Sequence, residues 1–272
     1  MTKRLFHRPV LSRFDLGLVR SAGAGLGNLL LPVARALVGQ ETHGGEFVYP
    51  TFPQLKIGTF LRREKDKRTY FDVFRPRRMR DWRVWLDAKR SPRISETEVR
   101  EGLEPSGCVD YEGLGAYFHD LVGHGAPIGH WMRDNHVPKG AMTRPYDIAV
   151  HVRLGDFAPT GGADGGHSIR QTFEWYREAI DLAKSVISVS DPEILVFPDE
   201  DAGGVIERLG LGTRGSADPG GNAVTSILNM SRARAVVTSR STFSAWGVFL
   251  SDAPAVWSRE FEFDRYFPRR ES

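Results

Sequence analysis

The sequence predicts an α/β protein of two units, each built around its own parallel sheet. Between residues 146 and 258, short apolar runs alternate with amphipathic helical segments. This alternation is typical of parallel strands joined by right-handed crossovers. Near the N-terminus, an apolar run, a glycine-rich turn, a helix and a second apolar run follow one another in the same order. We place an N-terminal domain at 1–140 and a C-terminal domain at 141–272.

In the N-terminal domain, the apolar run at 15–19 predicts a strand that leads into the glycine-rich turn. A helix is expected at 28–39 and a second strand at 45–50, which Pro50 ends. The segment 51–100 is rich in Pro and Arg and receives no assignment. The spacing of apolar residues predicts a helix at 114–121 and a further helix at 128–132.

The C-terminal domain begins with a buried strand that contains the segment "YDIAVHVRLGDF". The long helix after it carries Phe173, Tyr176, Ile180 and Ala183 on one face. The remaining predicted elements, in chain order, are strand 193–201 with acids at its end, helix 202–211, helix 223–233, strand 234–240, a helix from 241 and strand 254–258.

Composition limits the class of protein and its expected location. Of the 272 residues, 40% are hydrophobic and 26% are charged, which suits a folded globular chain. Cys108 is the only cysteine, so no disulfide can form within the chain. The N-terminal residues lack the continuous apolar core of a signal peptide, and no apolar run reaches the ~20 residues of a membrane span. We therefore expect a cytoplasmic protein.

Charge is concentrated in one block of the sequence. Residues 62–90 hold 12 Lys or Arg against 5 Asp or Glu, a local net charge of +7 in a chain whose total is +3. The block also contains aromatic residues, including Trp82 and Trp85. Such a surface can bind a glycan, a membrane surface or nucleic acid, or can be a solvated, ion-paired surface.

The first motif is "GAGLGN", Gly23 to Asn28, before the predicted helix. A dinucleotide fingerprint needs a third glycine at position 28 and an acid at the end of the second strand. The sequence has neither, so this fingerprint is excluded. The alternatives are a plain tight turn or a turn whose backbone and helix start approach an anionic ligand.

The second motif is "HVRLGDF", 151–157, where a predicted strand ends. Ligands of open α/β sheets bind at this end of the strands. Alternation places His151 and Arg153 on one face, and a guanidinium can form two parallel hydrogen bonds with a diphosphate. Asp156 can orient an arginine or cap a turn, and a structural Arg–Asp pair is the alternative.

The third motif is "TSRSTFSAWGVFLSD", 238–252, where the hydroxyl residues Ser239, Ser241, Thr242 and Ser244 separate an apolar strand from an apolar helix. Hydroxyls and backbone N–H groups at a helix start form an anion site, and simple helix capping is the alternative.

The three motifs together resemble the fucosyltransferase superfamily, most closely its bacterial α-1,2 type, with relatives among α-1,6- and protein O-fucosyltransferases. The resemblance rests on the Gly–Leu–Gly–Asn turn, the His-x-Arg-x-Gly-Asp element and the Ser-x-Phe-Ser element near the C-terminus. It spans both ends and the middle of the chain and leaves 51–100 unmatched. The chain departs from the family pattern at Leu154, where a second Arg is usual, and at Ala245, where a Trp is usual.

The resemblance implies a glycosyltransferase of the GT-B-like type, with two Rossmann-like units facing a cleft. It implies inverting transfer of L-fucose from GDP-fucose to a hydroxyl of a glycan or glycolipid, with no metal and no cofactor besides the donor. Arg153 and Asp156 are then the expected catalytic residues. The expected donor-binding residues are His151, Arg153, Ser241, Thr242, Phe243, Gly25, Gly27 and Asn28.

Several points stay open at this level. The catalytic base can be Asp156, Asp164 or His167, and the acidic run at 199–201 is expected to be a solvated strand end, not a metal site. The expected partners are a GDP-sugar and a glycan or lipid-linked glycan, with peripheral membrane contact through 62–90 and no nucleic acid. The alternatives are a transferase for another nucleotide sugar, or a non-catalytic basic module that binds glycans or nucleic acid.

Overall fold

A computed structural model describes residues 4–21, 23–55, 69–139, 145–154, 171–199, 201–239, 241–258 and 263–268. The chain divides into two compact units, of which the first contains residues up to Val137 together with the C-terminal segment from Phe267, and the second runs from Pro138 to Tyr266. Phe267 joins the first unit by stacking on Phe118, with ring centroids 4.7 Å apart. Each unit has a parallel sheet, as the sequence predicts.

The sheet of the first unit has the strand order β3-β1-β6-β5, and all neighbouring strands are parallel. Its strands are β1 (Leu5–Pro9), β3 (Glu46–Phe47), β5 (Arg93–Ser95) and β6 (Gly107–Tyr111). A separate two-stranded parallel ladder pairs β2 (Arg20–Ser21) with β4 (Gln54–Leu55).

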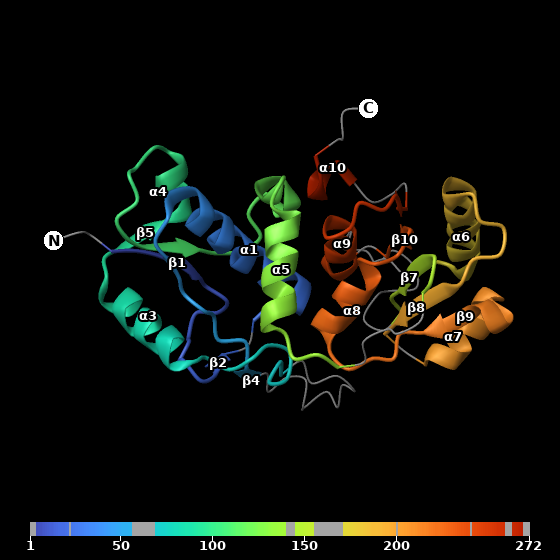
Figure 1. The fold of residues 1–272 in the computed structure, drawn as a ribbon, viewed down its shortest axis with the longest axis horizontal. Helices are drawn as coiled ribbons and strands as arrows, with labels where there is room; N and C mark the ends of the chain where they lie inside the picture. Colours follow the sequence, from blue (N-terminus) through green and yellow to red (C-terminus); the bar gives the residue numbers. More distant parts are fainter. Residues whose placement is uncertain are drawn as a thin grey trace, which may run out of the picture. The chain divides into compact units, whose positions relative to one another are not determined.

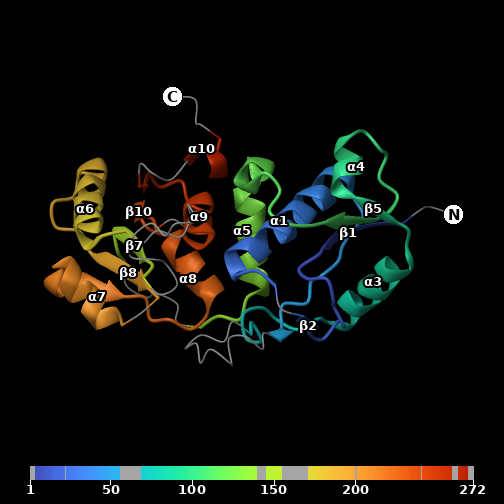
Figure 2. The same cartoon turned by 180° about the vertical axis from the view of Figure 1, so that it is seen from behind.

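Helices cover both faces of this sheet. Residues alternate along β6, so that Cys108 packs with helix α3 (Met79–Arg90) while Val109 and Tyr111 pack with helix α1 (Leu26–His43). Figures 1 and 2 show these two helices on opposite sides of the sheet. The shorter helices of the unit are α4 (Glu96–Arg100), η1 (Tyr117–Leu121) and α5 (Gly125–Asn135).

The strand predicted at 15–19 is wrong. The strand that precedes α1 in the sheet is β1, and residues 14–21 form a hairpin in which Ser21 N donates to Phe14 O and Leu16 N donates to Val19 O. Gly17 has φ +88°, a left-handed conformation that a strand does not contain. The apolar side chains of Leu16 and Leu18 therefore face solvent instead of the core.

The sheet of the second unit has the order β11-β10-β7-β8-β9, again with all neighbouring strands parallel. The strands are β7 (Ile148–Val152), β8 (Ile194–Pro198), β9 (Gly215–Ala217), β10 (Ala235–Val237) and β11 (Ala255–Val256). The helices are α6 (Phe173–Ile187), α7 (Ala202–Leu209), η2 (Gly212–Arg214), α8 (Ala223–Met230), α9 (Thr242–Phe249) and α10 (Phe263–Tyr266).

The core of the second unit lies between the sheet and α6. The four apolar residues predicted to share one face of α6 are all buried there, against Ile148, Val150 and Val152 of β7. Helices α8 and α9 pack on each other, and a Cβ on Gly247 would lie 2.5 Å from Met230 Sδ, so this contact depends on glycine. Within the described residues, no helix is long and apolar enough to cross a membrane.

Candidate functional site

The carboxyl ends of β7 and β10 form the candidate site of the second unit. From β7 the chain proceeds through β8 to β9 on one side, and β10 then returns to pair with β7 on its other side. The direction of strand order therefore reverses between β7 and β10. In open parallel sheets, the crevice at such a reversal is where ligands bind. The second and third sequence motifs follow these two strands.

The structure brings His151 of β7 together with residues that follow β10. A hydrogen bond of 2.5 Å joins His151 Nδ1 to Ser239 Oγ, and both side chains are buried. The His151 ring also lies 5.2 Å from the Phe243 ring, centroid to centroid. The sequence proposed His151 and Phe243 as donor-binding residues from motifs about 90 positions apart, and adjacent strands place them in contact. Ser239 was one of the hydroxyl residues of the third motif but was not among the expected donor-binding residues.

His151 is held in its neutral form. Its burial lowers its pKa to about 3, and the positive charge of Arg153 acts in the same direction. A neutral imidazole has one N–H donor and one bare nitrogen. In the hydrogen bond with Ser239, therefore, either Nδ1 donates to the hydroxyl oxygen or the hydroxyl donates to Nδ1. The hydrogen bond and the Phe243 contact thereby fix the ring orientation, leaving Arg153 to supply the positive charge at this strand end.

Arg153 and Leu154 diverge just beyond the end of β7. Leu154 is buried in the same core cluster as Val150 and Val152, on the side covered by α6. Its backbone N donates to Asp199 Oδ1 at 2.8 Å, which ties this strand end to the end of β8. Arg153 is half-buried and shares the opposite side with His151. Leucine at 154, where the family pattern has arginine, therefore serves the core.

Helix α9 starts at the same edge, with its first turn locked by serine hydroxyls. Ser241 caps the helix by accepting from Phe243 N at 3.1 Å. Ser244 Oγ donates to Ser239 O at 3.0 Å, and Ser241 N donates to the same carbonyl at 2.8 Å. The helix thus directs the positive end of its dipole toward the crevice. Capping and anion binding are compatible here, because the cap uses only one of the N–H groups of the first turn.

The second departure from the family pattern has a packing explanation. Ala245 and Trp246 are completely buried in α9, and Trp246 packs edge-to-face on Phe249. The replacement of the usual tryptophan by Ala245 therefore concerns the packing inside this unit.

In the glycine-rich turn of the first unit, Gly23 is closely packed, whereas Gly25 has open space beside it. A Cβ on Gly23 would lie 2.7 Å from Arg20 Nη1 and 2.8 Å from Leu11 O, so this glycine is required by close packing. Gly25 is the exposed N-cap of α1 and has open space where a Cβ would project. Gly27 and Asn28 lie inside the first turn of α1, and Asn28 N donates to Gly25 O at 3.0 Å. The Gly25 end of the turn therefore has open space beside it.

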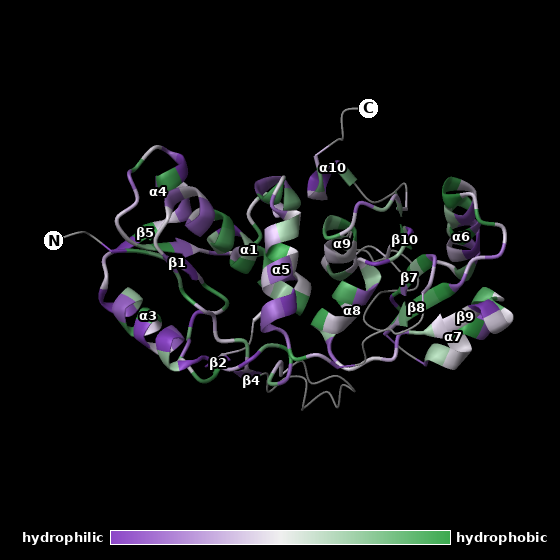
Figure 3. Cartoon of the chain, viewed as in Figure 1, coloured by the Kyte–Doolittle hydropathy of each residue, from purple (hydrophilic) through white to green (hydrophobic). Residues whose placement is uncertain are grey.

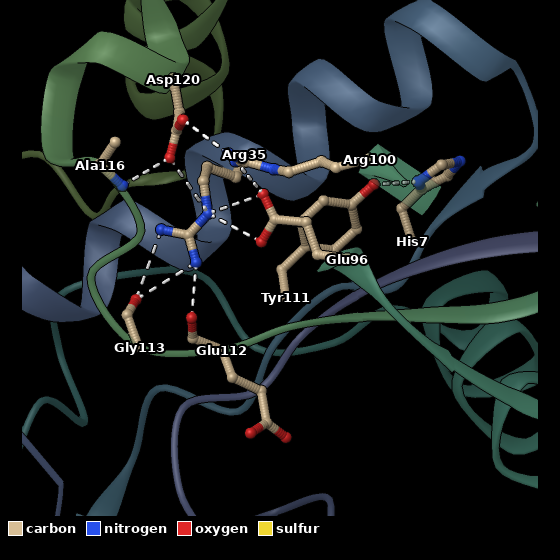
Figure 4. A network of polar contacts seen from close by, with 9 residues as sticks. All are labelled: His7, Arg35, Glu96, Arg100, Tyr111, Glu112, Gly113, Ala116 and Asp120. Carbon is tan, nitrogen blue, oxygen red and sulfur yellow. Dashed lines mark hydrogen bonds and ion pairs between the residues drawn. The ribbon is translucent and has the colours of Figure 1, made fainter. Parts of the chain in front are cut away.

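A buried ion network fastens the loop that follows β6 in the first unit (Figure 4). Arg35 of α1 donates to Glu96 Oε2 at 3.0 Å and to the backbone oxygen of Glu112 at 2.6 Å. Asp120 accepts from Arg100 Nη1 at 3.0 Å, and Figure 4 shows the Glu112 side chain pointing away from this cluster. Sequence reasoning missed this network, because its members come from segments far apart in the chain, and Glu96 and Arg100 lie in the region that received no assignment.

His7 is a second buried histidine, near the same strand end. Its Nδ1 is 2.8 Å from Tyr111 Oη and its Nε2 is 2.8 Å from Gly44 O. Burial lowers its pKa to about 4, so it is neutral in the folded protein near neutral pH.

The acidic run at 199–201 has structural partners. Asp199 accepts from Leu154 N, and Asp201 caps α7 by accepting from Gly204 N at 2.7 Å. In the part of the chain that the structure describes, no group of three or more His, Cys, Asp or Glu side chains is arranged to hold a metal ion. Asp156, Asp164 and His167, the candidates for the catalytic base, lie outside the described residues.

Comparison with known proteins places the fold. The structure matches the fucosyltransferase NodZ from Bradyrhizobium with a TM-score of 0.52 and 15% identity, over 92% of this chain and 94% of that one. Weaker matches include NodZ α-1,6-fucosyltransferase co-crystallized with GDP (TM-score 0.48, 14% identity, 92% and 93% covered). Another is POFUT1 in complex with GDP (TM-score 0.46, 14% identity, 92% and 97% covered).

The chain shares the two-unit α/β fold of the fucosyltransferase NodZ. No protein-family model matches the sequence. No curated protein matches it either. The α/β fold with parallel sheets that the motif resemblance implied is therefore confirmed, at 15% identity to the matched structure.

Proposed function

We propose that this protein is an inverting, metal-independent glycosyltransferase that moves L-fucose from GDP-fucose to a hydroxyl of a glycan or glycolipid. The observation that supports it most directly is the strand-order reversal of the second sheet. There His151, Arg153 and the start of α9 come together in a fold shared with a fucosyltransferase. The donor-binding role of Ser241, Thr242 and Phe243 follows from the same placement.

The chemistry of the proposal is a displacement at the sugar anomeric carbon. The acceptor oxygen forms a bond to this carbon while the bond to the GDP oxygen breaks, and attack from the opposite face inverts the configuration. Negative charge grows on the departing diphosphate. Arg153 and the N–H groups at the start of α9 stabilise that charge, because fixed cations and dipoles need no reorganisation during the reaction. The acceptor proton passes to a base, for which Asp156, Asp164 and His167 remain the candidates.

The other parts of the proposal concern the first unit and the location. The open N-cap at Gly25, together with Gly27 and Asn28, is proposed to bind the donor or the acceptor. The acceptor is a glycan or a lipid-linked glycan. The protein acts in the cytoplasm and contacts a membrane peripherally through the basic block at 62–90.

The test is GDP binding and GDP-fucose turnover in the wild type and in Arg153→Ala. Calorimetry is expected to show micromolar GDP binding, and the release of GDP from GDP-fucose can be followed without a known acceptor. Arg153→Ala is expected to lower turnover by about 10²-fold or more with an unchanged melting temperature. Lys184→Ala, which removes a half-buried cation of α6 that pairs with Asp181, is the matched control.

Two outcomes would contradict the proposal. The first is near-normal turnover in Arg153→Ala. The second is the absence of GDP binding combined with salt-sensitive binding to an oligonucleotide, which indicates a non-catalytic module. Metal independence has its own check, because EDTA is expected to leave turnover unchanged.

A further inference from the structure

The outer side of α3 carries a stripe in which arginines alternate with exposed aliphatic side chains. Val84, Trp85 and Ala88 face the core of the first unit. On the opposite side, a stripe at helical spacing faces solvent, and Figure 3 shows polar and apolar segments alternating along the helix. The stripe consists of Met79, Arg80, Arg83, Leu86 and Arg90.

The hairpin 14–21 places two more exposed aliphatic residues beside this helix. Gly17 lies against Trp82, so that a Cβ there would be 2.7 Å from the ring. Arg77 donates to Gly17 O and Lys89 Nζ donates to Asp15 O at 3.3 Å, which fixes the hairpin tip on α3. The tip presents Leu16 and Leu18, which are 75% and 73% exposed. We call Leu16, Leu18 and the α3 stripe the docking face.

The docking face has a positive charge because the neighbouring acids are engaged elsewhere. Asp81 pairs with Arg75 at 2.6 Å, and Asp87 pairs with Arg4. Asp15 lies 3.9 Å from Arg77 and accepts from the Thr51 hydroxyl. No ion pair of the described residues involves the three arginines of the stripe, which are Arg80, Arg83 and Arg90.

We propose that the docking face binds the headgroup region of an anionic lipid bilayer. Exposed aliphatic groups interleaved with arginines suit this partner, because the apolar side chains enter the acyl boundary while the cations meet anionic headgroups. A second copy of the chain does not fit, since it would bring like charges together. Single-stranded nucleic acid fits poorly, because its bases stack on exposed aromatic rings, and Trp82 and Trp85 are covered by Gly17, Arg77 and Lys89. A duplex binds through its phosphates and makes no use of the exposed aliphatic side chains.

This inference rests on the membrane contact in the proposed function and assigns that contact to α3 and the hairpin 14–21. The predicted block began at residue 62, whereas the docking face combines α3 with a hairpin that precedes that block by more than 40 positions. Vesicle binding is measured without turnover, so a failure of this inference and a failure of the transferase proposal are distinguishable.

The experiment is co-sedimentation of the full chain with vesicles of phosphatidylcholine alone or mixed with phosphatidylglycerol. The wild type is expected to bind the anionic vesicles at low salt. L16S/L18S is expected to weaken binding about tenfold or more, since two aliphatic anchors are lost. R80E/R83E is expected to weaken it at least 25-fold, at about fivefold for each lost cation. L182S/V186S, which changes two exposed aliphatic residues of α6, is the control and keeps wild-type binding.

The melting temperature and the far-UV circular dichroism spectrum show whether each variant is folded. The inference is overturned if the wild type does not bind anionic vesicles, or if folded L16S/L18S and R80E/R83E both bind as the wild type does. It is also overturned if R80E/R83E loses binding, L16S/L18S keeps it, and a duplex oligonucleotide displaces the protein from vesicles. That pattern indicates a surface for soluble polyanions.

Discussion

Removing the Ser239 hydroxyl tests whether the pairing with His151 serves the ligand as well as the fold. In Ser239→Ala, His151 Nδ1 loses its 2.5 Å partner in a place where water does not reach it. A buried polar atom left without a partner costs about 1–3 kcal/mol of unfolding free energy. At roughly 3 °C for each kcal/mol, the melting temperature is expected to fall by about 5 °C.

The same substitution is expected to weaken GDP binding. Without the hydroxyl, the imidazole is held only by its contact with Phe243, 5.2 Å away between ring centroids, and it can rotate from its binding orientation. The loss of one oriented hydrogen bond corresponds to about a tenfold rise in the dissociation constant for GDP. Calorimetry with GDP, well below the melting temperature of the variant, measures this directly.

Ser251→Ala is the matched control. Ser251 is also buried in the second unit, and its hydroxyl donates to Val248 O at 3.1 Å, at the far end of α9. We expect Ser251→Ala to lower the melting temperature and to keep wild-type GDP affinity. If Ser239→Ala lowers stability while GDP binds as tightly as to the wild type, the pairing is structural and the reasoning about the site is refuted.

Three further predictions concern stability. Because the pKa of His7 falls from 6.5 to about 4 on folding, the unfolded chain binds more protons below pH 6.5, so stability present above that pH is lost as the pH falls toward 4. Between pH 7.5 and pH 5, denaturant titration is expected to show about 2 kcal/mol more loss of stability in the wild type than in His7→Gln, while His151 adds a loss in the same direction to both proteins. Gly23→Ala is expected to lower the melting temperature, whereas Gly25→Ala keeps it and lowers GDP-fucose turnover; equal melting temperatures for both variants would contradict the assignment of close packing to Gly23. Arg35→Met is expected to cost about 1–3 kcal/mol in denaturant titration, because the backbone oxygen of Glu112 loses its donor and Glu96 keeps only its pairing with Arg100, and a loss below about 0.5 kcal/mol would show that the network is dispensable.

The sequence by itself determined the elements whose pattern has one interpretation. Helix α6 has a long amphipathic repeat, and its four predicted apolar residues are buried together. Strands β7, β8 and β10 are apolar runs bounded by polar residues, and each was predicted. The motifs at 151–157 and 238–252 were also assigned to strand ends, because helix and strand patterns change there. Such local patterns need no knowledge of the neighbours.

Tertiary structure decided which apolar runs enter the sheets. The run at 15–19 and the strands β1 and β6 are all short, and a short apolar run does not show whether it is buried. β1 is inside because it pairs with both β3 and β6, whereas Gly17 turns the run at 15–19 back on itself over Trp82. Strand β9 was missed for a related reason, since an edge strand of three residues has too few positions to show a pattern.

Tertiary structure also decided the partners within the site. From the sequence, Ser239 is one hydroxyl among several, and Leu154 is a departure from a family pattern. The pairing of β7 with β10 makes Ser239 the partner of His151, and the pleat turns Leu154 into the core while Arg153 stays beside His151. Residue types and their order are local properties of a chain, but the atom that each side chain meets depends on strands that lie about 90 residues apart.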